Sequence, residues 1–226
     1  MAKVFLGVGH GGNDPGAVKY LVEKTVNLEI AKYCRDYLAA NSVKVLLSRE
    51  KDENDPLAEE IKECNAFSPD LAVDIHSNAG GGDGFEVYYY HGGGKSKELA
   101  QNIEKEVIAI GQNSRGCKTK LNSQGKDYFG FIRQTNAPAV IVEGFFVDNQ
   151  NDSTQNQNKL KLFGEAYAKG ILKTLGINTP TNHMPPNNNN HKRFKVQVGS
   201  FENLKHAENL KNNLSKLGFE TFIVTE

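Results

Sequence analysis

The sequence predicts an α/β protein, in which a mostly parallel, twisted sheet carries helices on both faces and a small βαβ unit follows. Apolar runs of strand length alternate with amphipathic segments over residues 3–175, and this alternation is typical of parallel strands linked by helices. Residues 139–144 have the nearly continuous apolar sequence AVIVEG, as a central strand covered on both faces requires. A stretch rich in proline and asparagine then interrupts the alternation, which indicates a linker.

Five predicted elements occupy the first third of the chain. Lys3–Gly9 is an apolar run that predicts a strand, and Leu21–Ala40 follows with apolar residues near helical spacing. Val43–Ser48 predicts the second strand. Pro56–Phe67 predicts the second helix, since proline is favoured at the first position of a helix. Leu71–His76 is again apolar and predicts a strand.

The pattern continues to residue 175. Gly84–Tyr90 predicts a strand, and Ser96–Asn113 predicts a helix from the spacing of its apolar residues. Phe129–Gln134 is expected to be a short extended segment that precedes the central strand Ala139–Gly144. Asn158–Leu175 then closes the first domain as a helix.

A second, shorter unit is expected at the end of the chain. The sequence predicts a strand at Phe194–Val198, a helix at Asn203–Leu217 and a strand at Glu220–Val224. These 34 residues are too few to bury a useful core alone. The predicted organisation is a first domain, a linker and a second unit, at residues 1–175, 176–192 and 193–226.

Composition excludes several classes of protein. The chain has 226 residues with 27 basic and 27 acidic side chains, so its formal net charge is zero and neither nucleic acid nor an anionic membrane is an expected partner. No apolar run has the length of a membrane span. The N-terminal run predicts a first strand rather than a signal peptide. The three cysteines of the chain are scattered, which argues against a disulfide framework and indicates small buried residues.

Four side chains that can bind a metal follow predicted strand ends or begin a helix. His10 lies in GVGHGGNDPGA after the first strand, His76 ends the strand in LAVDIHSNAG, and Glu143 ends the strand in PAVIVEGFFVDN. Glu23 begins the first helix, so it can reach the same edge. Because ligands gather outside the carboxyl ends of parallel strands, we expect these four residues to lie together.

This set of residues suits metal-assisted hydrolysis. Two histidines and one carboxylate are a common zinc ligand set that leaves a fourth position for water, and a second carboxylate is then needed to carry the proton. Taken singly, each residue also has an ordinary explanation: a capping histidine, an acid favoured at a helix start, or a buried acid paired with an arginine. No HExxH helix is present to strengthen the zinc interpretation.

Five motifs in order resemble the zinc-dependent N-acetylmuramoyl-L-alanine amidases of the Amidase_3 family over residues 3–175. They are GHGGNDPGA, EKTVNL, DIHSNA, GFEVYYY and PAVIVEGFFVDN. The resemblance implies that His10, Glu23 and His76 bind Zn²⁺ and that Glu143 is the catalytic acid/base. It also implies hydrolysis of the bond between N-acetylmuramic acid and L-alanine in bacterial peptidoglycan.

Some positions depart from that family or stay open. Asp74 stands where serine is usual, and Glu60 where arginine is frequent; both are expected outside direct contact with the metal. Arg133 is a candidate substrate contact, with a solvated or ion-paired arginine as the alternative. Two other functions stay open: a zinc peptidase acting within the stem peptide, and a catalytically silent wall-binding protein.

The end of the chain resembles the start of a SPOR domain, a peptidoglycan-binding module. FKVQVGSF and the following NLKHAENLKNNLSKLGFETFIV supply the first βαβ half of its ferredoxin-like βαββαβ fold. Such a half leaves a gap in its sheet, so we expect two copies to complete each other in a homodimer through residues 193–226. The protein is expected to be made in the cytoplasm and to act on the wall after mother-cell lysis or phage-type release.

Overall fold

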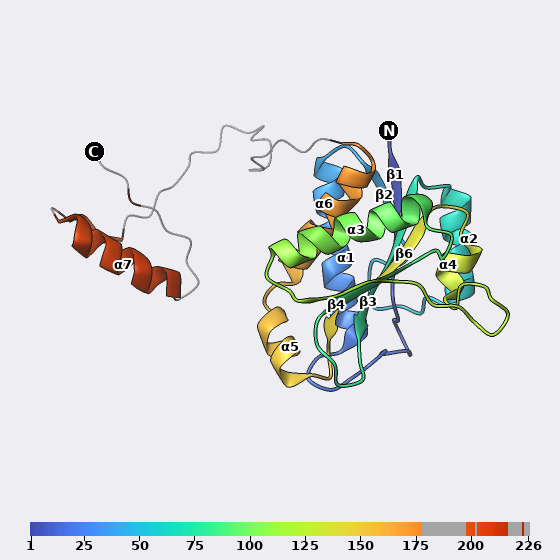
Figure 1. Cartoon of the computed structure of the whole chain (residues 1–226), viewed down its shortest axis with the longest axis horizontal. Helices are drawn as coiled ribbons and strands as arrows, with labels where there is room; N and C mark the ends of the chain where they lie inside the picture. Colours follow the sequence, from blue (N-terminus) through green and yellow to red (C-terminus); the bar gives the residue numbers. More distant parts are fainter. Residues whose placement is uncertain (178–197, 202, 217–222, 224–226) are drawn as a thin grey trace. The chain divides into compact units, whose positions relative to one another are not determined.

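The computed structural model describes residues 1–177, 198–201, 203–216 and 223 (Figure 1). The chain divides into two compact units, Met1–His183 and Met184–Glu226, which are described separately. The predicted linker lies outside the described residues except for residues 176 and 177, and the predicted strands Phe194–Val198 and Glu220–Val224 do so except for Val198 and Ile223.

A six-stranded sheet with the order β2-β1-β3-β6-β4-β5 forms the first unit. All neighbouring strands are parallel except β4, which runs antiparallel to β6. The expected mostly parallel α/β sheet is therefore confirmed. The strands are β1 (Lys3–Val8), β2 (Lys44–Leu47), β3 (Leu71–Asn78), β4 (Phe85–Tyr89), β5 (Ser114–Lys118) and β6 (Ala139–Phe146).

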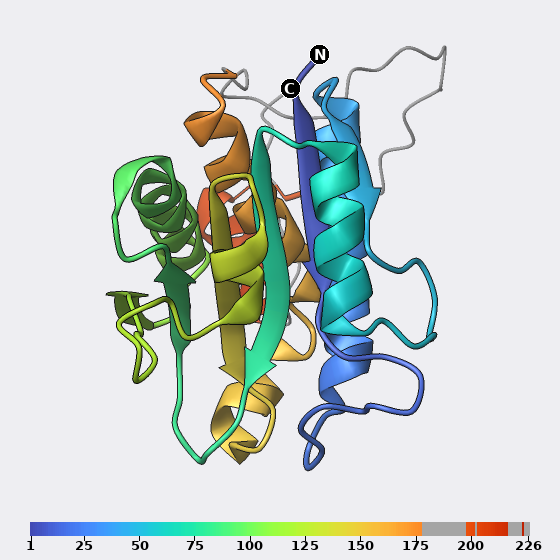
Figure 2. The same ribbon diagram turned by 90° about the vertical axis from the view of Figure 1, so that its right-hand side faces the viewer.

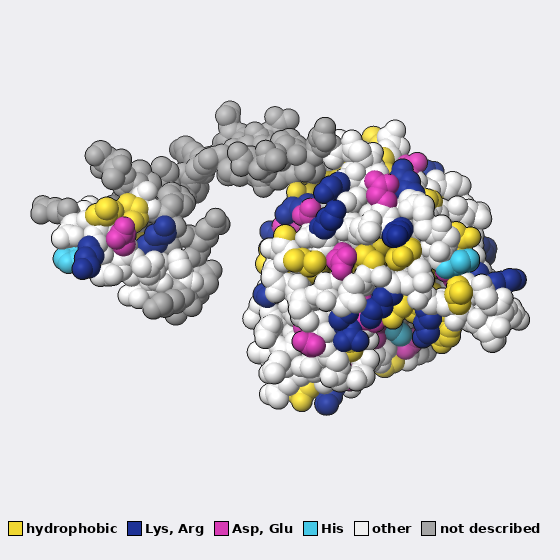
Figure 3. Space-filling view, viewed as in Figure 1, with side chains coloured by type: hydrophobic (Ala, Val, Ile, Leu, Met, Phe, Trp, Pro, Cys, Tyr) yellow, Lys and Arg dark blue, Asp and Glu magenta, His cyan; other side chains and the backbone are white. Residues whose placement is uncertain are grey.

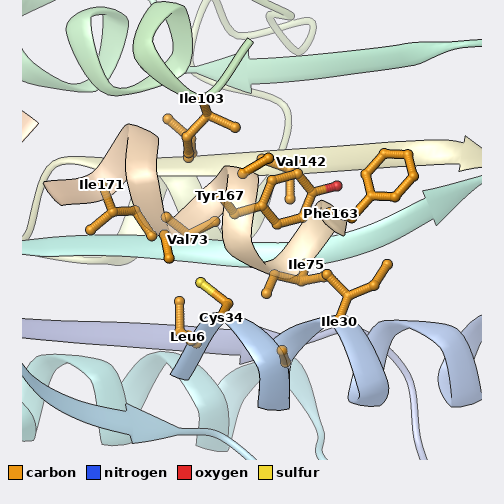
Figure 4. Packing of buried hydrophobic residues seen from close by; sticks show 14 of the residues in the cluster. Leu6, Ile30, Cys34, Val73, Ile75, Ile103, Val142, Phe163, Tyr167 and Ile171 are labelled. Atoms are coloured by element: carbon orange, nitrogen blue, oxygen red, sulfur yellow. The ribbon is translucent and has the colours of Figure 1, made fainter. Parts of the chain in front are cut away.

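One face of the sheet carries the larger core, under three long helices. These helices are α1 (Glu23–Ala40), α3 (Gly94–Ala109) and α6 (Leu160–Thr174). Their apolar side chains, such as Ile30, Ile103 and Phe163, pack on Val73 and Val142 of the central strands (Figure 4). Each of these five residues has 0% exposure, so the helices fix the positions of the central strands.

The opposite face is covered by two shorter helices, which lie together in Figure 2. They are α2 (Leu57–Phe67) and α4 (Gly130–Gln134), and they build the second core on alternate strand residues. Along β3, Ala72 belongs to this core, whereas Asp74 and His76 follow it on the same face because side chains alternate with a period of two. Along β6, Ile141 is likewise followed by Glu143. Polar side chains thus occupy this face toward the carboxyl ends of the central strands.

Four elements differ from the sequence-based expectation. Residues 130–134 form helix α4 instead of an extended segment, because Phe131 and Ile132 both pack into the second core there. Strand β5 was not predicted, since SRGCK has no apolar run, and the expected helix at 96–113 ends at Ala109. Helix α5 (Gln150–Asn156) is short and polar, and Asn149 caps its N-terminus by accepting from the backbone N–H groups of Asn151 and Asp152.

The second unit contains helix α7 (Leu204–Lys216), close to the predicted helix at 203–217. Its half-buried residues Ala207, Leu210 and Leu214 share one face, whereas Leu204 is 60% exposed. Among the helices that the structure describes, none combines the length and apolarity needed to cross a bilayer. Cys34 and Cys64 are buried as expected, and Cys117 is half-buried.

Candidate metal centre

Three predicted ligands converge at one edge of the sheet. His10 follows β1, Glu23 is the first residue of α1, and His76 lies on β3. One ligand atom from each residue lies within 4.8 Å of the others. Glu23 Oε1 lies 3.2 Å from His10 Nε2 and 3.1 Å from His76 Nδ1. The structure therefore brings together the set that the sequence predicts.

Glycines allow this close approach. A Cβ at Gly9 would lie 2.3 Å from His76 Cε1, inside the imidazole ring's contact distance. A Cβ at Gly16, whose φ is +64°, would lie 2.6 Å from His10 Cδ2 and 2.7 Å from Glu23 Oε2. His10 itself has φ +63°, an uncommon conformation for a residue with a side chain. The glycine-rich segment therefore gives the ligands room and turns His10 toward the edge.

Each imidazole uses its second nitrogen to contact a carboxylate. His10 Nδ1 lies 2.8 Å from Asp14 Oδ2, and His76 Nε2 lies 3.3 Å from Asp74 Oδ2. Carboxylates in this position fix the tautomer and the ring orientation of metal-binding histidines. They leave His10 Nε2 and His76 Nδ1 facing Glu23, where an ion would be bound.

Glu23 is held as an ionised carboxylate. Its side chain is buried, and it accepts hydrogen bonds from the backbone N–H of Ala17 at 2.9 Å and of Ser77 at 3.2 Å. Burial opposes ionisation, but the contacts with His10 and His76 outweigh it and hold the pKa of Glu23 well below its usual range. Glu23 is therefore available as an anionic ligand at every physiological pH.

The electrostatics of the centre favour a cation. The hydrogen bond with Glu23 raises the pKa of His10, against the effect of burial. Burial also opposes the charge on His76, but Asp74 and Glu23 raise its pKa well above the ordinary value. Such carboxylates stabilise positive charge, whether carried by protons or by a metal ion.

The donor set fits a tetrahedral ion. Ligand atoms bound at the usual 2.0–2.1 Å from zinc stand on the order of 3.3 Å apart, and the contacts from Glu23 Oε1 to the two imidazoles are 3.2 and 3.1 Å. The residues present therefore suit one divalent ion without rearrangement of the sheet.

Glu143 lies beside the centre on β6. It is the direct pairing partner of His76 on β3, so both side chains project from the same face. Burial is the largest effect on Glu143 and raises its pKa. The attraction of His76 lowers the pKa and the repulsion of Glu23 raises it, and the result is a pKa of about 7. A carboxyl with that pKa can both accept and donate a proton near neutral pH.

The two departures from the family pattern lie in one buried cluster beneath His76. Glu60 Oε1 and Asp74 Oδ1 both point at the space over Gly7, 2.0 and 2.7 Å from where a Cβ would stand. Burial, reinforced by the charge of Asp74, raises the pKa of Glu60 well above its ordinary value. Asp74 contacts the centre through His76.

Arg133 lies on α4. Its Nη1 donates to the backbone carbonyls of Asp127 and Tyr128, and so ties the loop before α4 to the helix. A contact with substrate remains a prediction. The sequence analysis did not single out Asp14, which lies within the first motif. It also did not single out Glu86 and its partners Arg115 and Lys118, although Glu86 lies within GFEVYYY.

The fold and the site define an α/β protein with a candidate metal centre at the carboxyl edge of its sheet. The sequence matches the N-acetylmuramoyl-L-alanine amidase family over residues 4–173 and the SPOR domain over residues 190–226. The chain belongs to this amidase family, whose members are hydrolases.

Named relatives agree with this assignment. The amidase CwlM of Bacillus licheniformis is 31% identical over 99% of this chain and 85% of its own length. The sporulation-specific amidase of Bacillus subtilis is 33% identical, with the same shares covered. The catalytic domain of the amidase CwlV from Bacillus (Paenibacillus) polymyxa superposes with a TM-score of 0.71 at 28% identity, over 79% of this chain and all of that domain.

Proposed function

We propose that the protein is a zinc-dependent N-acetylmuramoyl-L-alanine amidase that hydrolyses the amide bond between N-acetylmuramic acid and L-alanine in bacterial peptidoglycan. The observation that carries this proposal is the convergence of His10, Glu23 and His76 beside Glu143, in a member of the amidase family.

Zinc is the ion that best suits the donors. Two imidazole nitrogens and one carboxylate oxygen are nitrogen and oxygen ligands of the kind found in hydrolytic zinc sites, which keep one position open. His10, Glu23 and His76 would hold the ion. When bound, zinc supplies a Lewis acid that polarises the amide carbonyl and lowers the pKa of water.

Glu143 is the proposed proton carrier. With its pKa raised to about 7, it accepts a proton from the attacking water and returns it to the nitrogen of L-alanine as the amide bond breaks. Asp14 and Asp74 keep both imidazoles in one tautomer through their contacts at 2.8 and 3.3 Å.

Replacing Glu143 tests the proposal. Glu143→Gln keeps the shape of the side chain but cannot take up a proton, so we expect wall digestion to fall by at least about 100-fold while one zinc per chain is retained. Zinc content and digestion would be measured together, with and without a chelator. Glu165→Gln on α6, a helix that packs on the opposite face of the sheet from Glu143, is the matched control. Full activity of Glu143→Gln would overturn the assigned role.

The products separate the two enzymatic alternatives. An amidase releases a new free amine on L-alanine, whereas a peptidase acting within the stem releases it on another residue. If the wild-type protein carries zinc and digests nothing, the silent wall-binding alternative replaces the proposal.

The second unit is the proposed wall anchor. Residues 193–226 would bind peptidoglycan, which the SPOR match supports, and would join two chains into a homodimer. Three apolar side chains at the start of the described part are exposed: Val198 at 62%, Phe201 at 45% and Leu204 at 60%. Exposed apolar groups of this kind favour association. The sporulation-specific relative supports action on the wall after mother-cell lysis, and the similarity to the endolysin of Bacillus phage SPP1 supports phage-type release.

A further inference from the structure

A row of charged side chains continues from the metal centre across the sheet. His76 pairs with Glu143, and Glu143 pairs with Glu86 of the antiparallel strand β4. Directly paired residues project from the same face, so the three side chains lie side by side. Beyond β4, the edge strand β5 adds Arg115 and Lys118.

Glu86 organises the end of this row. Its Oε2 accepts from Arg115 Nε at 2.8 Å and from Lys118 Nζ. Its Oε1 accepts from Asn78 Nδ2 and from the Tyr88 hydroxyl, each at 3.0 Å. Burial opposes the charge on Glu86, but these donors lower its pKa to about 2. Glu86 is thus a fully bonded anion that fixes two cations.

Glu86 uses only part of the hydrogen-bonding capacity of the two cations. The bond with Glu86 uses one of the five N–H donors of Arg115. The side chain of Arg115 is 39% exposed and that of Lys118 is 33% exposed, against 8% for Glu86. Arg115 also lies over the Phe146 ring, 5.1 Å from its centroid. Together with Glu86, the exposed carboxylate of Asp83 raises the pKa of Arg115. Figure 3 shows Lys and Arg side chains gathered over the region of β4, below α3.

The chemistry of the substrate indicates which of its groups would contact these cations. The following step rests on the proposed function. The carboxyl group of N-acetylmuramic acid is consumed in the scissile amide, and N-acetylated sugars are neutral. Negative charge therefore resides on the peptide side of the bond. β5 lies two strands from β6, or roughly 10 Å at the usual strand spacing, which an extended peptide covers in about three residues.

We propose that Arg115 and Lys118 form an anion subsite for a carboxylate of the stem peptide, about two or three residues beyond the scissile bond. Glu86 is the positioning residue of this subsite. The subsite fixes the direction of the substrate: the peptide crosses β4 and β5, and the glycan lies on the side of β1.

Wild-type protein tests the subsite without any substitution. Two soluble N-acetylmuramoyl peptides would be compared, one with free carboxylates on the second and third residues and one with both carboxylates amidated. A hydrogen bond to a charged group contributes about 1.5 kcal/mol or more, so we expect kcat/KM to be at least about tenfold higher for the free acid. Equal values would overturn the subsite. Cleavage of neither peptide would instead contradict the proposed function.

Single variants assign the effect to the cations. Lys118→Gln and Arg115→Gln should each lose most of the preference, so that the ratio of kcat/KM for the free acid to kcat/KM for the amidated peptide falls toward one. Lys126→Gln removes an exposed cation from the loop between β5 and α4 and should keep the preference. Equal losses on both peptides would show a merely structural role and overturn the proposal. Arg115→Lys, which keeps the charge and can still bond Glu86, guards against loss of folding and should retain part of the preference.

Discussion

Two imidazoles and three carboxylates act as one unit at the scale of single residues. Each histidine lies between Glu23 on the side of the metal and a second carboxylate behind it, Asp14 for His10 and Asp74 for His76. Asp14 is exposed, whereas Asp74 is buried against Glu60. Asp74 therefore supports the metal centre through His76 and also repels buried Glu60.

Asp74→Asn should separate these two effects. The amide accepts from His76 but carries no charge, so we expect zinc affinity to fall about 10-fold or more. In the metal-free protein, loss of the repulsion between Asp74 and buried Glu60 is offset by loss of the attraction between Asp74 and His76, so we expect little change in stability. Chelator competition and thermal unfolding measure the two quantities. Asp36→Asn, at an exposed ion pair with Arg35 on α1, should change neither. Unchanged zinc affinity in Asp74→Asn would refute the role given to Asp74.

The sequence predicts the functional residues best where their side chains suit one specific chemistry. His10, Glu23, His76 and Glu143 follow strand ends or begin a helix, and their motifs resemble one family, so their gathering could be predicted. Asp14 and Arg115 could not be assigned, because a carboxylate or an arginine in a polar segment has many ordinary uses. Their contacts become visible only when the pairing of strands and the path of the loop are known.

At the scale of elements, α6 is the helix that closes the larger core. It approaches α1 closely at Gly164 and α3 closely at Gly170. A Cβ at Gly164 would lie 2.6 Å from the Ile30 carbonyl oxygen of α1, and one at Gly170 would lie 2.6 Å from Ile103 Cα of α3. Both obstacles are backbone atoms, which cannot turn aside as a flexible side chain does.

Gly170→Ala should therefore destabilise the protein. Alanine favours a helix interior over glycine by about 1 kcal/mol, but overpacking against backbone costs about 1–3 kcal/mol, so a net loss of up to roughly 2 kcal/mol is expected. Denaturant unfolding measures this difference. Lys161→Ala, at an exposed position of the same helix, should change stability by less than about 0.5 kcal/mol. An increase in stability for Gly170→Ala would show that α3 and α6 can separate at little cost.

Elements were predictable where an apolar period was long. The helices α1 and α6 and the central strands have such periods, and the structure contains them. Strand β5, by contrast, has the sequence SRGCK, and its pairing with β4 and its charged bonds to Glu86 hold it in place. The segment 130–134 is too short for a period, and burial of Phe131 and Ile132 decides its helical form.

At the scale of the whole molecule, the chain combines a hydrolase domain with a short wall-binding unit. The boundaries at residues 175 and 192 remain predictions, since most of the intervening residues lie outside the part that the structure describes. In the second unit, α7 buries one face formed by Ala207, Leu210 and Leu214 only partly. A unit of this size gains stability most readily by association.

Association through the second unit predicts a dimer of the full chain. The monomer has a mass of 24.9 kDa, so sedimentation at micromolar concentration should give about twice this mass, while a chain that ends at residue 192 should sediment as a monomer. Leu204→Asp places a charge at a 60% exposed apolar position and should shift the full chain toward monomer. Asn209→Asp introduces the same charge at an exposed polar position of α7 and should leave the dimer intact.

Because two anchors on one particle rebind before both release, the dimer should also stay on insoluble peptidoglycan longer than the Leu204→Asp variant. A full chain that stays monomeric at every concentration tested would contradict the homodimer and leave the amidase assignment untouched.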